Sequence, residues 1–314
     1  MSKHCRIIAM FEQMFAQEAS GGGRRGPGGG NFHFSGGGFP GGGGFPGGGF
    51  GGGHGGGRAR PPPDLFPKET SKVARLGKPK FPNASSKHLW LVMFYSSDSR
   101  GAHEAASVLE KLAAKTTLAY KVGAVDCHKT EREHQFCIEK GVDDESLPQF
   151  AMVVDGEVKF YDNGDYAVTS KGLHEFSQSH MPQHLIHNVN NVPQLEERLL
   201  VQEGKQPAVL LLTDKYETSS LYYSLAYQFR TDFVFGESRA KNLKLAQQFG
   251  VKKYPQLIVF VPASGSGQMA GEEKYNENVN MIRYNGDLDK DSITKWLEQV
   301  AAKPKKSSSS RKSR

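Results

Sequence analysis

The stretch LVMFYSSDSRGAH, residues 91–103, joins an apolar run, a polar turn and the start of a helical pattern. Residues 88–96 (HLWLVMFYS) are typical of a buried strand. In residues 102–115, which follow the turn, apolar side chains recur on one face at helical spacing. The stretch therefore predicts a strand that ends at a polar turn, followed by an amphipathic helix.

Strands and helices continue to alternate after this unit. Leu147-Pro148 precedes an apolar run, and Asp155-Gly156 marks a hairpin turn after it. The expected strands cover residues 120–125, 149–154 and 157–161, and the expected helices cover 131–140 and 171–180. The predicted order is β-α-β-α-β-β-α.

The same order recurs in the second half of the chain. Tyr254-Pro255 takes the place of Leu147-Pro148 before an apolar run. The expected strands are 208–213, 233–235, 256–261 and 279–284, the expected helices are 219–229, 240–249 and 292–301, and 262–278 is expected to be a polar loop. Two copies of one pattern predict an α/β protein with tandem domains of one fold, each a central mixed sheet flanked by helices.

The flanking segments differ in composition from this region. Of the 37 glycines, 23 lie between Gly21 and Gly57, where the few phenylalanines cannot build a core. We expect residues 1–64 to form a disordered Gly/Phe-rich linker and residues 303–314 to form a basic Ser/Lys/Arg tail. No apolar run is long enough for a transmembrane helix, so no membrane partner is expected.

The positive charge also lies in the flanks. The net charge is +7 overall, +7 in residues 1–84 and +6 in residues 303–314, which leaves −6 for residues 85–302. A globular nucleic-acid-binding surface concentrates basic residues on the domain itself. The charge distribution therefore argues against nucleic acid as the partner of the folded region.

These residues resemble the thioredoxin superfamily, and protein disulfide isomerases in particular. The resemblance is carried by LVMFYSSDSRGAH, by VGAVDCHKTEREHQFCIEKGV, by SLPQFAMVVDGEVKFY and by GVKKYPQLIVF in the second copy. It implies two thioredoxin-like domains, over residues 65–183 and 184–302. No motif for a cofactor is present, and none is expected.

The chain departs from the redox members of that superfamily at each chemical position. By the resemblance, the two active-site cysteines would fall at Ser99 and Ala102, and a buried glutamate would fall at Met93. Thiol–disulfide exchange needs an attacking thiolate, which a serine hydroxyl cannot replace. We therefore expect a degenerate redox motif, no catalytic residues and no enzyme activity.

The remaining cysteines of the folded region are Cys127 and Cys137. The resemblance implies a structural disulfide between them; two separate free thiols are the alternative that a reducing compartment favours. A thiol–disulfide oxidoreductase or isomerase that uses this pair is the alternative function. His128 and His134 lie close by, but their spacing with the cysteines matches no standard zinc site, so no metal is predicted.

In the thioredoxin superfamily the residues around a cis-proline pair with extended peptides. By this resemblance Leu147, Pro148, Tyr254 and Pro255 are candidate peptide-binding residues, in a form of β-augmentation. The alternative is that they only shape the loop before a strand. Tyr95 is a further candidate, with a place in the core as its alternative.

The Gly/Phe-rich tract, preceded by MFEQMF, is similar to the linker that follows the J domain in DnaJ-type co-chaperones. No His-Pro-Asp tripeptide occurs, so an Hsp70 partner is expected only if a J domain lies upstream of a truncated product. The resemblance implies a chaperone or co-chaperone that binds unfolded polypeptide clients during protein folding. It points to the endoplasmic reticulum lumen, although SSSSRKSR is no retrieval signal; the cytoplasm is the alternative.

Overall fold

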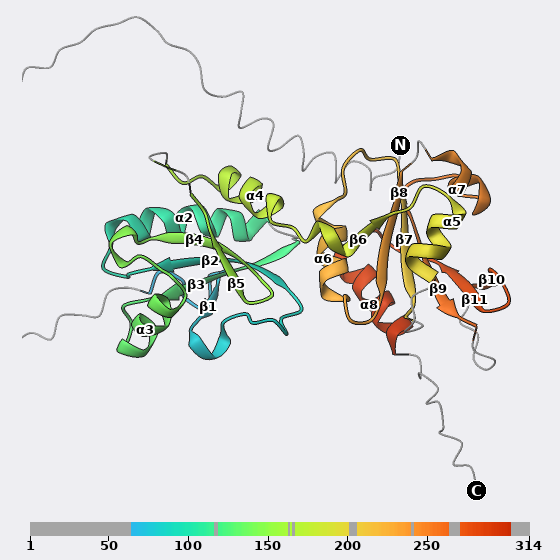
Figure 1. Cartoon of the computed structure of the whole chain (residues 1–314). Helices are drawn as coiled ribbons and strands as arrows, with labels where there is room; N and C mark the ends of the chain where they lie inside the picture. Colours follow the sequence, from blue (N-terminus) through green and yellow to red (C-terminus); the bar gives the residue numbers. More distant parts are fainter. Residues whose placement is uncertain are drawn as a thin grey trace, which may run out of the picture. The chain divides into compact units, whose positions relative to one another are not determined.

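The computed structural model describes residues 64–115, 119–162, 164, 167–200, 206–239, 242–263 and 271–302. The predicted Gly/Phe-rich linker, apart from residue 64, and the predicted basic tail lie outside these residues. The described residues contain two mixed sheets flanked by helices, as expected for two thioredoxin-like domains (Figure 1).

The first sheet has the strand order β1-β3-β2-β4-β5. Its central strand β2 runs parallel to β3 and antiparallel to β4. The edge strand β1 is parallel to β3, and the edge strand β5 is antiparallel to β4. The bounds are β1 (Ala74–Leu76), β2 (Leu89–Tyr95), β3 (Tyr120–Asp126), β4 (Gln149–Val154) and β5 (Glu157–Phe160).

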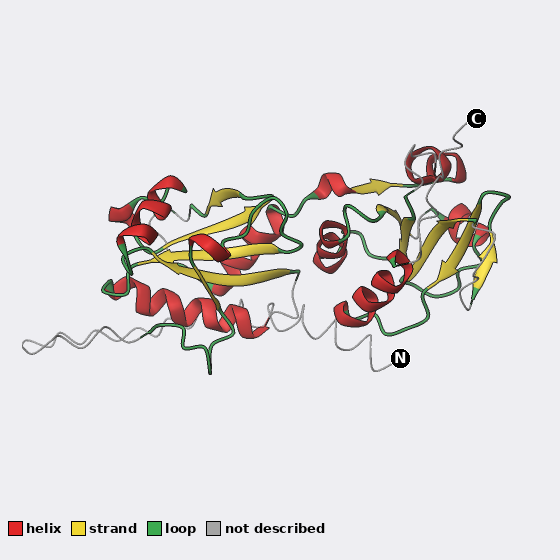
Figure 2. Cartoon of the chain, turned by 90° about the horizontal axis from the view of Figure 1, so that it is seen from below, coloured by secondary structure: helices red, strands yellow, loops and turns green. Residues whose placement is uncertain are grey.

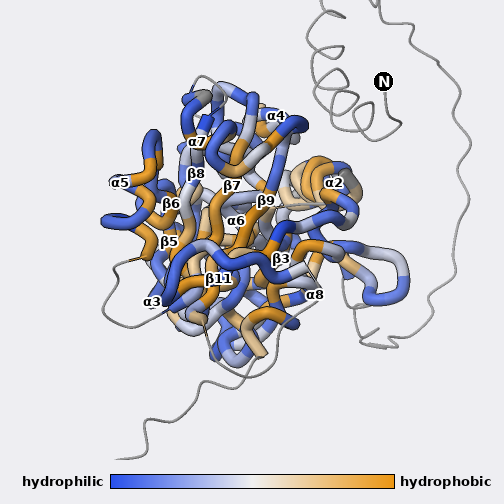
Figure 3. The backbone as a smooth tube through the Cα atoms, turned by 90° about the vertical axis from the view of Figure 1, so that its right-hand side faces the viewer, coloured by the Kyte–Doolittle hydropathy of each residue, from blue (hydrophilic) through white to orange (hydrophobic). Residues whose placement is uncertain are grey.

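Helices cover both faces of this sheet. Successive side chains of a strand point to opposite faces, so the apolar central strand needs a covering layer on each side. Leu91 and Met93 pack in one cluster with residues of α2 and α4, whereas Val92 and Phe94 pack with α3. Figure 2 shows the strands between helices, and Figure 3 shows hydrophobic residues along the central strands. The helices are α2 (Arg100–Lys115), α3 (Glu131–Glu139) and α4 (Ser170–Ser179), with the 3₁₀ turns η1 (Lys78–Lys80), η2 (Asp144–Ser146) and η3 (Gln183–Leu185).

The second sheet has the order β10-β11-β9-β7-β8-β6. Its central strand β7 is parallel to β8 and antiparallel to β9, as β2 is to β3 and β4. The bounds are β6 (Ile186–Asn188), β7 (Ala208–Thr213), β8 (Val234–Arg239), β9 (Gln256–Pro262), β10 (Glu272–Lys274) and β11 (Val279–Arg283).

The second sheet is also covered on both faces. Val209 and Val259 pack with residues of α6 and α8, whereas Leu210 and Ile258 pack with α5, η4 and α7. No helix in the described part of the chain is long and apolar enough to cross a membrane. The bounds are α5 (Val192–Leu195), the π-helical turn η4 (Glu196–Leu200), α6 (Ser220–Gln228), α7 (Leu243–Gln248) and α8 (Lys290–Ala301).

Two glycines occupy the same place in the two sheets. Gly123 of β3 lies beside the edge strand β1, and Gly236 of β8 lies beside the edge strand β6. A Cβ atom on Gly123 would lie 2.5 Å from Leu76 Cδ1, and one on Gly236 would lie 2.6 Å from Leu199 Cδ1. The shared close approach supports two copies of one fold.

Several predicted boundaries were wrong. The polar loop predicted over 262–278 contains β10, and the helix predicted from 240 begins only at residue 243, because β8 extends to Arg239. β8 is long because it is paired on both sides, by β7 and β6. The three-residue strands β1 and β6 were not predicted, since three residues are too few to show an alternating pattern.

A disulfide joins Cys127, just after β3, to Cys137 on α3, with a Cα–Cα distance of 5.8 Å. At most 1% of either residue is exposed, and both pack in the apolar cluster that contains Phe94 and Phe136. Of the two alternatives that the sequence leaves open, the structure has the bridged one.

We expect the Cys127→Ala/Cys137→Ala variant to lose about 2–3 kcal/mol of unfolding free energy, because the bridge closes a short loop in the unfolded chain. Urea denaturation measures the loss, with Cys5→Ser as the control that should leave the stability unchanged. Thiol titration of the unfolded, unreduced protein should find one thiol per chain; three thiols would contradict the bridge.

Burial at the start of β2 controls the ionisation of His88. Burial, and next the charge of Lys121, lower the pKa of His88 from 6.5 to about 4. The Nδ1 atom of His88 is buried and has no hydrogen-bond partner among the described residues. The folded protein therefore holds this imidazole neutral at a pH where the unfolded chain protonates it.

We expect His88 to lower stability on acidification. Between about pH 6.5 and 4 the His88 imidazole binds a proton in the unfolded state but not in the folded state. The free energy of unfolding therefore falls as pH falls. An NMR titration of the His88 ring should give a midpoint near 4. Urea denaturation at several pH values should show a smaller loss in His88→Gln; equal losses in both proteins would contradict the assignment.

Candidate functional site

The degenerate redox motif lies between the end of β2 and the first turn of α2. The Ser99 amide donates to the Ser96 carbonyl at 3.1 Å, and the Ala102 amide donates to the Ser99 carbonyl at 3.0 Å. Ser99 is half-buried, whereas Ala102 and Met93 are fully buried in the cluster that α2 covers. The first position of the degenerate motif, Ser99, is therefore partly exposed and the second, Ala102, is buried, and neither carries a sulfur.

The proline loop before β4 lies against this motif. The Leu147-Pro148 bond is cis. A Cβ atom on Gly101 would lie 3.3 Å from Pro148 Cδ and 3.7 Å from Ser99 Oγ. The strand register accounts for this contact, because Phe94, one residue before the end of β2, is paired with Gln149.

The backbone of the proline loop is available for pairing. Leu147 and Pro148 are half-buried. Among the described residues, no hydrogen bond uses the amide or the carbonyl of Leu147. An unpaired backbone donor and acceptor at a partly exposed position can accept an extended segment of another chain.

A corresponding loop precedes β9 in the second sheet. The Tyr254-Pro255 bond is also cis, Tyr254 is half-buried and Pro255 is exposed. Leu212 pairs with Gln256, as Phe94 pairs with Gln149. No hydrogen bond between described residues uses the Tyr254 backbone. The chain thus presents two proline loops of the same kind.

Tyr95 lies next to the motif but belongs to the core. Only 5% of it is exposed, and its ring centroid lies 5.6 Å from that of Phe66. Burial, and next the charge of Asp126, raise the pKa of its phenol well above the usual value. Of the five residues predicted to bind peptide, Tyr95 therefore offers the least surface.

Asp126, at the end of β3, is the ionisable group that the sequence did not single out. Burial raises the pKa of its carboxyl, although hydrogen bonds from His128 and Ser97 oppose this shift. The His128 amide donates to Asp126 Oδ1 at 3.2 Å. Without a thiol at Ser99 or Ala102, this carboxyl has no cysteine proton to accept.

In the second sheet a buried polar network occupies the position beside the helix start. Glu237 on β8 is 1% exposed, and its Oε2 accepts a hydrogen bond from Thr218, two residues before α6. Arg239 Nε lies 3.6 Å from Glu237 Oε1. This network was not predicted, because the strand was expected to end at residue 235, whereas β8 extends to Arg239.

The disulfide lies apart from the degenerate motif. Cys127 and Cys137 pack in the cluster on the α3 face of the sheet, whereas Met93 and Ala102 pack in the cluster on the α2 face. The structure therefore brings Ser99, Gly101 and Pro148 together and leaves the two sulfurs outside this group.

Comparison with known proteins gives distant relatives. No family model matches the chain. A protein of Dictyostelium discoideum, provisionally named a protein disulfide-isomerase, is 23% identical over 239 residues, which are 75% of this chain and 54% of the relative. The DnaJ protein ERDJ3A of Oryza sativa subsp. japonica is 28% identical over 176 residues, 54% of this chain and 29% of the relative. The chain thus spans about half or less of these relatives.

Among solved structures, a crystal structure of ERdj5 (form II) matches with a TM-score of 0.42 and 17% identity, over 74% of this chain and 30% of that chain. The strand order and the duplicated proline loops give the fold independently of this match. The chain has a thioredoxin-like fold and is distantly similar to a protein that is provisionally named a protein disulfide-isomerase and to a DnaJ protein.

We expect the Ser99→Cys/Ala102→Cys variant to regain thiol chemistry. The first position is partly exposed at a helix N-terminus, which lowers a thiol pKa, and the second lies one turn on. Oxidised glutathione should convert the two new thiols to a bridge, with a mass loss of two hydrogens and release of two molecules of reduced glutathione. The variant should also reduce insulin in the presence of dithiothreitol. Ser99→Cys alone is the control, and a double variant that forms no bridge would show that the redox geometry is gone.

Proposed function

We propose that this protein is a non-catalytic, chaperone-like binder of unfolded or extended polypeptides that acts in protein folding. The observation that supports this most is the pair of proline loops, at Leu147-Pro148 and Tyr254-Pro255. Each has unpaired backbone groups at a partly exposed position. The distant similarity of the chain to a protein disulfide-isomerase and to a DnaJ protein agrees with a role in protein folding.

Pairing through the backbone sets the expected affinity and selectivity. An extended client donates and accepts main-chain hydrogen bonds, which every sequence offers. Leu147 and Tyr254 add an apolar contact beside these groups. We therefore propose weak binding with broad sequence tolerance, as a protein that handles many unfolded clients requires.

We also propose that the chain is not an oxidoreductase. The attacking group in thiol–disulfide exchange is an accessible thiolate. Ser99 and Ala102 supply no sulfur, and the Cys127–Cys137 disulfide is buried among aromatic side chains. A buried bridge of this kind stabilises the fold and is shielded from attack.

The disulfide supports an oxidising compartment, since such bridges persist in the secretory pathway and are rare in the cytosol. We propose the endoplasmic reticulum lumen as the location, with unfolded polypeptides as partners. An Hsp70 partner follows only for a longer protein that carries a J domain. The acidic balance of residues 85–302 argues against nucleic acid.

We expect Leu147→Asp/Tyr254→Asp to weaken client binding about fivefold or more, because a charge beside each loop opposes apolar contact and costs about 1 kcal/mol. The measurement is the fluorescence anisotropy of a labelled, extended apolar peptide. Ile138→Asp/Tyr216→Asp is the matched control, since these large apolar residues are exposed elsewhere. Equal affinities of both variants would contradict the proposed sites.

The same preparations test the absence of catalysis. The unaltered chain should not reduce insulin beyond the rate of dithiothreitol alone, and Cys127→Ser should not change that rate. Turnover that depends on Cys127 would overturn the non-catalytic assignment in favour of an oxidoreductase.

A further inference from the structure

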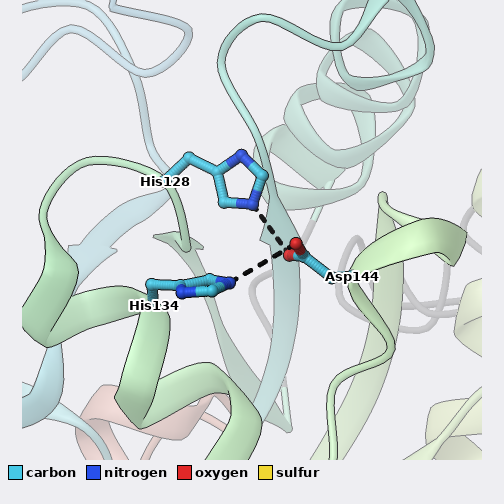
Figure 4. A group of neighbouring side chains, drawn as sticks. All are labelled: His128, His134 and Asp144. Atoms are coloured by element: carbon cyan, nitrogen blue, oxygen red, sulfur yellow. Dashed lines mark hydrogen bonds and ion pairs between the residues drawn. The ribbon is translucent and has the colours of Figure 1, made fainter.

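Three potential metal ligands meet on the surface of the first sheet's unit. His128 Nε2 lies 2.8 Å from Asp144 Oδ1, and His134 Nε2 lies 3.4 Å from Asp144 Oδ2. Figure 4 shows the two imidazoles directed at one carboxylate. All three donor atoms lie within 4.8 Å of one another. The three residues come from different segments, namely the end of β3, the helix α3 and the turn η2.

The two imidazoles are held by the disulfide. His128 follows Cys127 directly, and His134 precedes Cys137 by three residues, which is about one helical turn. The Cys127–Cys137 bridge ties the segment after β3 to α3 and so keeps the backbones that carry the two histidines close together. Their ring centroids are 5.4 Å apart, with the ring planes at 75°.

The carboxylate is held by the turn that leads into β4. The Asp143 amide donates to Gln149 Oε1 at 2.9 Å, and Asp143 Oδ1 accepts from the Glu145 amide at 3.2 Å. These bonds anchor the backbone on both sides of Asp144. The three donors are therefore positioned by a covalent bridge and a hydrogen-bonded turn before any ion arrives.

We propose that His128, His134 and Asp144 form a Zn²⁺ site with three protein ligands and one open position. Tetrahedral zinc with nitrogen and oxygen ligands at about 2.0–2.1 Å places its donors about 3.3 Å apart. The distances of 2.8 Å from His128 Nε2 to Asp144 Oδ1 and of 3.4 Å from His134 Nε2 to Asp144 Oδ2 bracket this value. All three donors lie within 4.8 Å of one another, which is close enough for one ion to bind them after side-chain adjustment.

The donor set selects the class of ion. Ca²⁺ and Mg²⁺ prefer oxygen ligands, whereas two of these three donors are imidazole nitrogens. The sulfurs of Cys127 and Cys137 are bonded to each other and are not available as ligands. The third ligand is therefore Asp144 and not one of the two cysteines. Only the folded turn before β4 brings Asp144 to the histidines.

An imidazole that binds a metal through Nε2 carries its proton on Nδ1, so Zn²⁺ at this site selects that tautomer of both histidines. The side chains are between 31% and 45% exposed, so water can reach the open position. The site is thus open on one side, and a water or a partner side chain completes the tetrahedron.

Isothermal titration calorimetry tests the site, with Zn²⁺ added to metal-free full-length protein in a Cys5→Ser background that removes the remaining free thiol. We expect one equivalent of Zn²⁺ to bind, and Ca²⁺ at the same concentration not to bind. His128→Gln, His134→Gln and Asp144→Asn should each weaken binding more than about tenfold, since even outer-shell partners of a metal contribute about 10–100-fold. Zn²⁺ should raise the Tm of the parent and not of Asp144→Asn.

His103→Gln is the matched control, because His103 is exposed on α2, away from the cluster, and its substitution should leave the affinity unchanged. Far-UV circular dichroism checks folding, and Asp144→Asn, which preserves the side-chain shape, carries the test if a histidine variant unfolds. Absence of a stoichiometric Zn²⁺ site would overturn the proposal. Binding that survives all three substitutions, or that is lost equally in His103→Gln, would also overturn it.

Discussion

The pairing of a central strand on both sides is the constraint on which the candidate site depends. β2 is hydrogen-bonded to β3 along one edge and to β4 along the other, so its register cannot shift without moving both faces of the core. The pairing of Phe94 with Gln149 places Pro148 beside the start of α2. Ser99, Gly101 and Pro148 are therefore brought together by strand register, independently of any sulfur chemistry.

The positions that carry redox chemistry in related folds are filled here by groups that serve packing. Ala102 and Met93 extend the apolar cluster under α2. The second sheet has a separate polar network, in which Glu237 contacts Thr218 and Arg239. A buried carboxylate is costly unless it is paired. Thr218 donates a hydrogen bond to Glu237 Oε2, whereas Glu237 Oε1 has only the Arg239 guanidinium at 3.6 Å and no hydrogen bond among the described residues.

The strands with long apolar runs could be predicted from the sequence. The short strands that exist only because they pair with a neighbouring strand could not. The strands 149–154 and 208–213 were predicted to the residue, since each buries both faces and shows an uninterrupted apolar run. The three-residue edge strands depend on hydrogen bonds to β3 and β8, which the local pattern does not record. The repeat predicted two mixed sheets and the paired proline loops, but not the strand order of either sheet.

The candidate site shows the same division. The resemblance to the thioredoxin superfamily pointed to Ser99, Ala102 and Pro148, because each lies in a stretch of sequence that carries the resemblance. Asp126 and Glu237 could not, because their burial is set by segments far along the chain. Asp144 lies ten residues from His134, and only the turn before β4 brings the two side chains together.

The duplication of the proline loop matters for the proposed binding of unfolded polypeptides, because two loops on one chain would hold a long client more tightly than one. Under that proposal an unfolded chain offers many extended segments, and binding of one segment raises the local concentration of the others. The second encounter is then intramolecular and proceeds at a raised effective concentration. Retention would therefore grow with client length and vanish once the client folds, a form of avidity that distinguishes unfinished chains from finished ones.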